Sequence, residues 1–333
     1  MTPSRRETAV VLAPLRARRV LVVLMPDVHL QDMAGPVQVL DEASHLGGAY
    51  QLSYCGAEGA VRSAQGLLLA DLLPLPAPRE GDLVLIPGTS SAKLDQLAVP
   101  GDWLRAASDA GARIASVCTG AFALARAGLL DGRRCTTHWK VVARLAAEAP
   151  RARVVDDCLF IEDGGLITSA GVASGIDMAL SLVEQDWGPL VAARVAREMV
   201  VYLRRNGQEE QRSVYLDHRT HLHPGVHRVQ DWLVANPQKK PILSQLARIA
   251  AMSPRHLARV FRRATGVTPK QFAAKVKVQV ARDLLGDPQR TVEAIAASCG
   301  FDDARQLRRL WKESFGVSIA AFRAAHSNEG SAP

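Results

Sequence analysis

Two stretches in the C-terminal third of this chain, about fifty residues apart, repeat one pattern of apolar and basic residues. In the first stretch, apolar residues recur at helical spacing from Leu243 to Ala250 and again from Leu257 to Phe261. In the second, Val292 to Cys299 and Leu307 to Trp311 follow in the same order. A duplicated pair of short helices joined by a turn predicts two helix-turn-helix units.

The second helix of each unit carries a mostly basic polar face. Adding fifty to a residue number maps Arg255 to Arg305 and Arg259 to Arg309, and residues four apart lie on one helix face. Such faces enter the major groove of DNA in helix-turn-helix proteins. The residues expected to contact DNA are Arg255, His256, Arg259, Arg262, Arg263, Arg305, Gln306, Arg308, Arg309 and Lys312.

Arginine is the side chain best suited to the two acceptors of guanine, so the arginines early in each helix are expected to contact base edges. For Arg262, Arg263, Arg308 and Lys312, which lie later in the helices, contacts to phosphate are expected instead. For any single arginine a solvated charged surface is an equally good explanation. The duplication of the whole set favours DNA.

The net charge of +8 is unevenly distributed along the chain. Residues 1–211 carry 21 basic and 24 acidic side chains, net −3, whereas residues 212–333 carry 20 basic and 9 acidic, net +11. A basic domain of this kind is typical of nucleic-acid binders. Another polyanion, a membrane surface, or a basic face with no partner are the alternatives that charge alone leaves open.

The N-terminal part alternates short β-branched runs with helical patterns. Strands are expected at Val20 to Met25, Gln51 to Cys55, Leu83 to Ile86, Arg113 to Val117 and Leu166 to Thr168. Helices are expected at Pro36 to Leu46, Trp103 to Ala110, Ala121 to Ala127, Lys140 to Glu148 and Ser174 to Gln185. This alternation predicts a flavodoxin-like, doubly wound α/β domain with its site at the carboxyl ends of the strands.

Two residues at such strand ends carry chemistry. Cys118 follows a strand at a sharp turn into a helix, where we expect an exposed sulfur and a lowered thiol pKa; a buried structural thiol is the alternative. Asp32 lies in the loop before the helix expected at Pro36, as a loop acid or a helix cap. The five cysteines are scattered and odd in number, so neither disulfides nor a metal site is predicted.

Several short motifs between residues 19 and 190 occur in a characteristic order and spacing. They are Met25-Pro26, Asp32-Met33-Ala34-Gly35-Pro36, Ile86-Pro87-Gly88-Thr89, Ser116-Val117-Cys118-Thr119-Gly120-Ala121-Phe122 and Thr136-Thr137-His138-Trp139. With them the region resembles the ThiJ/PfpI superfamily of class I glutamine-amidotransferase-like domains. The resemblance implies a cysteine at 118 hydrogen-bonded to Asp32, no cofactor, and a ligand site formed by Asp32, Gly88, Thr89, Cys118, Thr119 and His138.

The departures from that superfamily bear on catalysis. Thr119 stands where protease-like members have His, and no His-x-Glu occurs in the sequence, so peptidase or glutaminase chemistry is not expected. The Cys-Thr-Gly motif with Asp32 is similar to that of the isocyanide hydratases, in which Cys is the nucleophile. Hydratase-like activity and redox sensing at Cys118 therefore stay as alternatives to a ligand sensor without catalytic residues.

Residues 224 to 324 resemble the AraC/XylS DNA-binding domain. The resemblance rests on Leu243 to Ala247, Phe261 to Pro269, Ile295 to Asp303 and Phe315 to Arg323, and Ile319 departs from it because the family usually has Pro there. It implies two helix-turn-helix units joined by a long helix at about Phe272 to Leu284. The two resemblances together are those of the GlxA group of bacterial transcription regulators.

The sequence thus predicts a flexible tail (1–18), a ligand-sensing and dimerisation domain (19–204), a linker (205–223), a DNA-binding domain (224–326) and a disordered tail (327–333). We expect a cytoplasmic protein, because no apolar run is long enough for a membrane span or a signal peptide. The resemblance to transcription regulators implies an activator. The resemblance implies promoter DNA, RNA polymerase, a second copy of the chain and a small, nitrogen-containing effector as its partners.

Overall fold

The computed structural model describes residues 17–97, 100–156, 158–201, 205, 207, 211, 218–287 and 289–327. The chain divides into two compact units, Met1–Gln211 and Arg212–Pro333, which we describe separately. The tails predicted at 1–18 and 327–333 lie outside the described residues except for 17, 18 and 327, as does much of the predicted linker.

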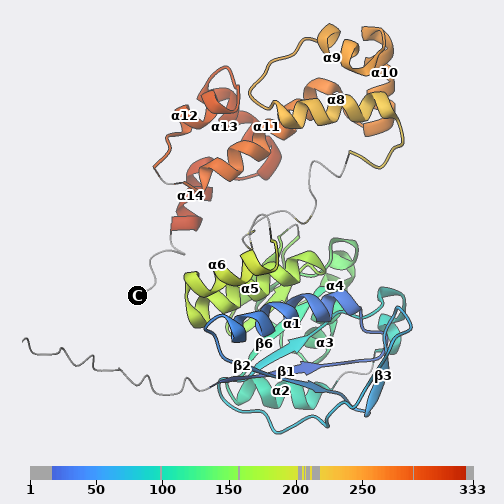
Figure 1. Ribbon diagram of the computed structural model, residues 1–333, viewed down its shortest axis with the longest axis vertical. Coiled ribbons are helices and arrows are strands. Elements are labelled where there is room, and N and C mark those ends of the chain that lie inside the picture. The colour runs from blue at the N-terminus through green and yellow to red at the C-terminus, as the bar shows by residue number, and fades with distance from the viewer. Residues whose placement is uncertain are drawn as a thin grey trace, which may run out of the picture. The chain divides into compact units, whose positions relative to one another are not determined.

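The N-terminal unit is built on a six-stranded sheet with helices on both faces (Figure 1). Its strands, in their order across the sheet, are β2 (Tyr50–Cys55), β1 (Arg18–Val23), β5 (Leu83–Ile86), β6 (Arg113–Val117), β10 (Leu166–Ser169) and β9 (Phe160–Asp163). Neighbouring strands are parallel except for β9, which runs antiparallel at one edge. The predicted doubly wound, flavodoxin-like fold is confirmed.

Two layers of helices bury the sheet. One layer consists of α1 (Leu30–His45), α5 (Ala173–Trp187) and α6 (Pro189–Glu198), and the other of α2 (Gly101–Asp109), α3 (Ala121–Arg126) and α4 (Val142–Glu148). Alternate residues of β1 and β5 belong to the two apolar cores, so these strands are apolar almost throughout. All four residues of β5 are buried.

Several short elements were not predicted, because two to six residues carry too little periodicity. Besides β9, these are β3 (Ala60–Arg62), β4 (Leu68–Ala70), β7 (Arg134–Cys135), β8 (Arg153–Val154) and the short 3₁₀-helices η1 (Ser91–Gln96), η2 (Cys118–Gly120) and η3 (Trp139–Val141).

The predicted start of the first helix at Pro36 is wrong. Helix α1 begins at Leu30, so Asp32 lies in its first helical turn rather than in a loop. Pro36 lies inside the helix, where its ring nitrogen cannot donate the usual backbone hydrogen bond. Because proline is most common in the first turn of a helix, the sequence pattern places the start six residues too late.

The C-terminal unit is helical, with α8 (Pro224–Ala235) preceding two helix-turn-helix units. These are α9 (Leu243–Ala250) with α10 (Pro254–Thr265), and α12 (Val292–Ser298) with α13 (Ala304–Phe315); α11 (Pro269–Leu285) joins them and α14 (Ile319–Ser327) follows. Phe272 and Val276 of α11 pack in the core of the first unit, and Val278 and Ala281 pack in that of the second. One long helix therefore supports both units, as predicted.

The duplication extends to the helix ends. The Ser253 hydroxyl accepts a hydrogen bond from the backbone N–H of His256 (3.3 Å), and the Asp303 carboxylate accepts one from that of Gln306 (2.7 Å). These N-caps differ by fifty in number and fix where each recognition helix begins. Ile319, at the position of the usual proline, is buried as the first residue of α14. Of the described helices, none is long and apolar enough to cross a membrane.

Candidate functional site

Cys118 lies directly after β6, at the turn into η2 and α3. Its backbone adopts a φ of +56°, in the left-handed region that non-glycine residues seldom occupy. The residue is only 5% exposed. The sharp turn predicted from the sequence is therefore present, but the Cys118 side chain is covered.

Two glycine loops cover that side chain. A Cβ atom on Gly171 would lie 2.6 Å from the Cβ of Cys118, and one on Gly88 would lie 2.9 Å from it. Carbon atoms cannot approach so closely, so backbone can pack against the cysteine only where these residues lack a side chain. Gly171 also has a φ of +123°, which itself favours glycine.

The expectation of an exposed sulfur with a lowered pKa is wrong. Burial, the larger cause, and the neighbouring Asp32 carboxylate, which would repel a thiolate, together raise the pKa of the Cys118 thiol to about 12. Hydrogen bonds to Thr119 lower the pKa, but by less than burial raises it. Cys118 is thus a buried thiol, the alternative that the sequence left open. Its burial and raised pKa argue against a nucleophilic or redox role at neutral pH.

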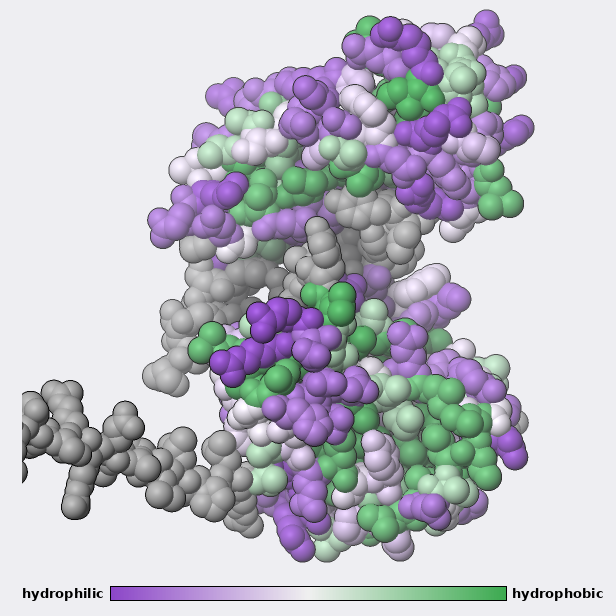
Figure 2. Space-filling model, in the orientation of Figure 1, coloured by the Kyte–Doolittle hydropathy of each residue, from purple (hydrophilic) through white to green (hydrophobic). Residues whose placement is uncertain are grey.

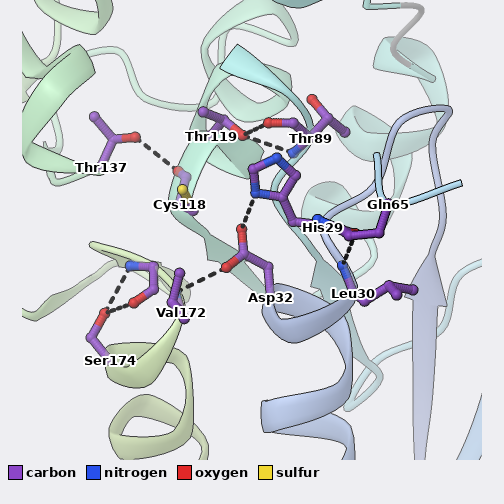
Figure 3. Close-up of polar contacts among 11 residues, drawn as sticks. His29, Leu30, Asp32, Gln65, Thr89, Cys118, Thr119, Thr137, Val172 and Ser174 are labelled. Atoms are coloured by element: carbon purple, nitrogen blue, oxygen red, sulfur yellow. Dashed lines mark hydrogen bonds and ion pairs between the residues drawn. The ribbon is translucent and has the colours of Figure 1, made fainter. Parts of the chain in front are cut away.

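Asp32 lies near Cys118 and contacts His29 and Val172 (Figure 3). Its carboxylate is fully buried, and Oδ1 accepts a hydrogen bond of 2.9 Å from the backbone N–H of Val172. Oδ2 lies 3.9 Å from Nδ1 of His29, the residue that precedes α1. Burial raises the pKa of Asp32. His29 is not among the residues predicted from the sequence, and its position three residues before Asp32 was the one available signal.

Thr119 and Thr89 are joined by two hydrogen bonds (Figure 3). The Thr119 hydroxyl donates to the carbonyl oxygen of Thr89 (2.6 Å) and accepts from its backbone N–H (2.7 Å). The Thr137 hydroxyl donates to the carbonyl oxygen of Cys118 (2.8 Å). Thr119, which replaces the histidine of protease-like relatives, therefore ties the cysteine turn to the loop after β5 instead of providing a base.

A pocket of about 180 Å³ lies beside this cluster. Gly171 connects the two, because it lines the pocket and also packs on Cys118. Of the six predicted ligand residues only His138 lines the pocket, whereas Asp32, Gly88, Thr89, Cys118 and Thr119 lie together in the buried cluster. Burial lowers the pKa of His138, which favours a neutral imidazole.

Residues that the sequence did not single out complete the pocket: Trp139, Val172, Arg205 and Gln211 are among them. Arg205 donates from Nη2 to the buried carboxylate of Asp177 on α5 (2.6 Å). The Gln211 side chain accepts from the backbone N–H of Trp139 (2.7 Å) and donates to the carbonyl oxygen of Thr137 (2.9 Å). Arg205 and Gln211, which we assigned to the linker, thus make contacts within the N-terminal unit.

The predicted DNA-contacting residues all lie on α10 and α13, and all are exposed except Gln306, which is half-buried. The opposite faces are apolar: Leu257 and Phe261 of α10, and Leu307 and Trp311 of α13, are buried. In Figure 2 the visible face of the C-terminal unit is mostly hydrophilic. Both helices thus present a basic surface, which is what contact with DNA phosphates and base edges requires.

The two basic surfaces differ in their ion pairs. On α13, Arg309 pairs with Glu313 (2.8 Å), and Arg308 pairs with Glu293 of α12 (2.8 Å). On α10, Arg259 instead lies 3.3 Å from the His256 ring. No acidic residue occurs within α10. The second recognition helix is therefore partly neutralised by carboxylates that the first lacks.

Comparison with known proteins shows to which family the chain belongs. The model of the DJ-1/PfpI family matches residues 18–185. The chain belongs to this family. A helix-turn-helix domain model matches residues 246–325, in agreement with the two predicted resemblances. Within the described residues, no group of three or more His, Cys, Asp or Glu side chains is placed to hold a metal ion.

Named relatives include transcriptional regulators. The HTH-type transcriptional regulator GbdR of Pseudomonas aeruginosa is 31% identical over 65% of this chain and 58% of its own length, so the match spans less than two thirds of that protein. The HTH-type transcriptional regulator CdhR of Pseudomonas aeruginosa is 27% identical over 91% of this chain and 90% of its own length.

An enzyme is also similar to the N-terminal unit: an isonitrile hydratase of Pseudomonas putida is 32% identical over 49% of this chain and 69% of its own length. A solved ThiJ/PfpI family protein from Pseudomonas syringae, 18% identical, has a TM-score of 0.51 and covers 83% of this chain and 97% of that one. The latter likeness concerns the fold alone.

Proposed function

We propose that this chain is a sequence-specific DNA-binding transcriptional regulator, acting as an activator, whose N-terminal unit binds a small effector. The duplicated helix-turn-helix unit with two exposed basic helices carries the proposal. Regulators among the relatives support it. Promoter DNA is the expected partner, and the arginines early in α10 and α13 are expected to select bases.

Binding of fluorescent duplexes to the full chain tests this proposal, using a sequence first selected from a random pool. Arg259→Ala and Arg309→Ala should each weaken the selected duplex by roughly 5- to 150-fold, the equivalent of 1–3 kcal/mol, and relax base preference. Arg263→Ala, a control for phosphate contacts, should weaken all duplexes about equally. If the double variant of Arg259 and Arg309 binds the selected duplex as tightly as wild type, the proposed recognition helices are wrong.

We place the effector in the pocket bordered by His138, Trp139 and Gly171. A volume of about 180 Å³ suits a molecule of metabolite size. The Trp139 ring is 43% exposed, with the Lys140 ammonium 5.4 Å from its centroid, and a planar group could pack on its exposed part. Ser174 and Gln211 add polar atoms. A small, nitrogen-containing effector fits this lining. The buried cluster around Cys118 then shapes the pocket wall through Gly171.

Native mass spectrometry of the full chain purified from its own host tests the effector site. A bound small molecule should appear as a mass increment on the wild-type chain and be lost in Trp139→Ala. Tyr54→Ala is the matched control, because Tyr54 is an aromatic residue of the same unit with similar exposure (38%) that does not line the pocket. An increment that survives in Trp139→Ala would place the ligand elsewhere.

The pocket also provides a route by which an effector could act on DNA binding. Arg205 and Gln211 line it, and the chain continues from Gln211 into the DNA-binding unit. An effector that displaces the Gln211 side chain would break its hydrogen bonds to residues 137 and 139, one residue before the DNA-binding unit begins. Gln211→Ala should then give the DNA affinity of the effector-bound protein without effector.

Homodimerisation and contact with RNA polymerase belong to the same proposal. Sedimentation velocity of the full chain tests the dimer, with a single monomeric boundary at micromolar concentration as the opposing result. Contact with polymerase is tested by transcription from the selected promoter with purified components, in which the chain should raise transcript yield.

Isonitrile hydration at Cys118 is a second candidate, favoured by the likeness to the hydratase and by the Asp32 carboxylate beside the thiol. The covered thiol and its raised pKa oppose it. Turnover of a simple isonitrile by the full chain, compared with turnover by Cys118→Ala, tests whether Cys118 catalyses hydration. Equal rates in the two proteins would remove this candidate.

A further inference from the structure

A cavity of about 700 Å³ lies inside the C-terminal unit, apart from the effector pocket. Its walls come from both helix-turn-helix units and from the helix that joins them: α9, α10, α11 and α13 all contribute. The volume is within the range of small-molecule sites. The duplication explains its position, because two packed units on one supporting helix leave a space between them.

The walls of this cavity are mainly apolar. Leu246 of the first unit and Phe301 of the second are buried beside it, and Leu310 of α13 is half-buried. At the mouth, the side chain of Ile242 is 63% exposed and that of Leu243 is 38% exposed. An apolar ligand body would cover these side chains, with a gain of roughly 25 cal/mol for each Å² of apolar surface removed from water.

The charged residues at the cavity are predominantly basic. Lys239, Lys240, Lys270 and Lys277 line it, with Asp302 as the acidic member, which forms an ion pair with Lys240. This leaves an excess of positive charge beside an apolar interior. A ligand that complements the cavity therefore has an apolar body and an anionic group.

Lys277 is the lysine best placed for such a group. It projects from the middle of α11, is half-buried, and donates a hydrogen bond to the carbonyl oxygen of Gly300 (2.7 Å). Its ammonium lies 6.0 Å from the Phe301 ring centroid. Burial lowers the pKa of Lys277, so an anion beside it would replace lost hydration. A held, partly dehydrated ammonium binds an anion better than a freely moving surface lysine does.

From these observations we infer that the cavity is a binding site for an amphipathic carboxylate, an aliphatic or aromatic acid whose head group pairs with Lys277 and whose body lies against Leu246, Phe301 and Leu310. Gln306 of α13 also lines the cavity, and it is one of the residues proposed to contact DNA. Occupancy should therefore change DNA affinity, a consequence that rests on the proposed function. Binding itself does not depend on DNA.

Isothermal titration calorimetry of the full chain with decanoate, below its micelle concentration, tests the site without DNA. Decanoate should bind saturably, and Lys277→Met should weaken it about tenfold or more, the worth of a charge-assisted hydrogen bond. Lys275→Met is the matched control, because Lys275 is an exposed lysine of the same helix that does not line the cavity. Its affinity should stay within about twofold of wild type.

A second variant tests the volume of the cavity separately from its charge. Ala274→Leu places extra carbon atoms in the cavity, keeps all four lysines, and should also abolish decanoate binding. Equal affinities of wild type and Lys277→Met, equally tight binding of decyltrimethylammonium, or no saturable decanoate binding would each overturn the inference. A Lys277→Met variant that loses only DNA affinity, in a chain that does not bind decanoate, would assign these lysines to phosphate contacts instead.

Discussion

The thiol of Cys118 should react with alkylating reagents about a thousand times more slowly than an exposed thiol. Only the thiolate reacts, and with a pKa of about 12 roughly one Cys118 thiol in ten thousand is ionised at pH 8. At the ordinary thiol pKa of 9.0, roughly one in ten would be ionised. The backbone of Gly88 and Gly171 packed against the side chain should slow the reaction further.

The measurement is iodoacetamide labelling of the native full chain at pH 8, followed over time by peptide mass spectrometry with glutathione as the reference thiol. Asp32→Asn removes the carboxylate that repels the thiolate, so Cys118 should be labelled faster. Labelling should still be slower than that of glutathione, because burial is the larger cause of the raised pKa. Asp41→Asn, an exposed position on the same helix, should leave the rate unchanged.

Two results would refute this reasoning. If native Cys118 is labelled as fast as glutathione, the side chain is not covered, and nucleophilic or redox chemistry returns as an explanation of the site. If Asp32→Asn does not change the rate, the carboxylate does not influence the thiol. Labelling after unfolding in urea should be fast for all variants, which controls for losses during peptide analysis.

Three further predictions concern stability. Asp32→Asn should raise Tm near neutral pH. Because the pKa of Asp32 is raised in the folded protein, ionisation of this carboxyl makes the fold less stable as pH rises above the ordinary carboxyl pKa of 3.8. In thermal melts at decreasing pH, the gain in Tm should therefore vanish below about pH 4. Ser253→Ala and Asp303→Ala should each lower the free energy of unfolding by about 1 kcal/mol in urea titrations; no loss would mean that the caps are not formed. Gly171→Ala should cost more than about 2 kcal/mol, because a strained φ adds to the overlap with the Cβ of Cys118. Adding Cys118→Gly should recover part of that loss.

The parts of the fold that could be predicted from the sequence are those whose burial leaves a pattern of apolar residues within one continuous stretch. Four of the five parallel strands, β1, β5, β6 and β10, are largely buried on both faces, so their mostly apolar runs are visible in the sequence. The recognition helices are visible for a similar reason, since one face of each is packed and the other is solvated. Helix α1 was misplaced at its start because Pro36 departs from the usual position of proline.

The features of the candidate site that were missed depend on contacts between distant segments. The carboxylate of Asp32 bonds to Val172, and Cys118 is covered by glycines at 88 and 171, positions that only the folded sheet brings together. The pocket includes Arg205 and Gln211, whose polar neighbourhood in the sequence is typical of a linker. Burial, and with it the direction of the thiol pKa, cannot be derived from the residues next to a cysteine.

The duplication fixes geometry but not electrostatics. Residues 224–268 carry eight basic and one acidic side chain, net +7, whereas residues 286–324 carry six basic and five acidic, net +1. The carboxylates that hold Arg308 and Arg309, at 293 and 313, correspond to Leu243 and Arg263 in the first unit. Since phosphate attraction scales with the cations that a protein brings to DNA, the first unit should supply most of the salt-dependent affinity. The second unit, whose recognition helix is capped at the equivalent position and which packs on the same supporting helix, then contributes chiefly through the bases that it selects.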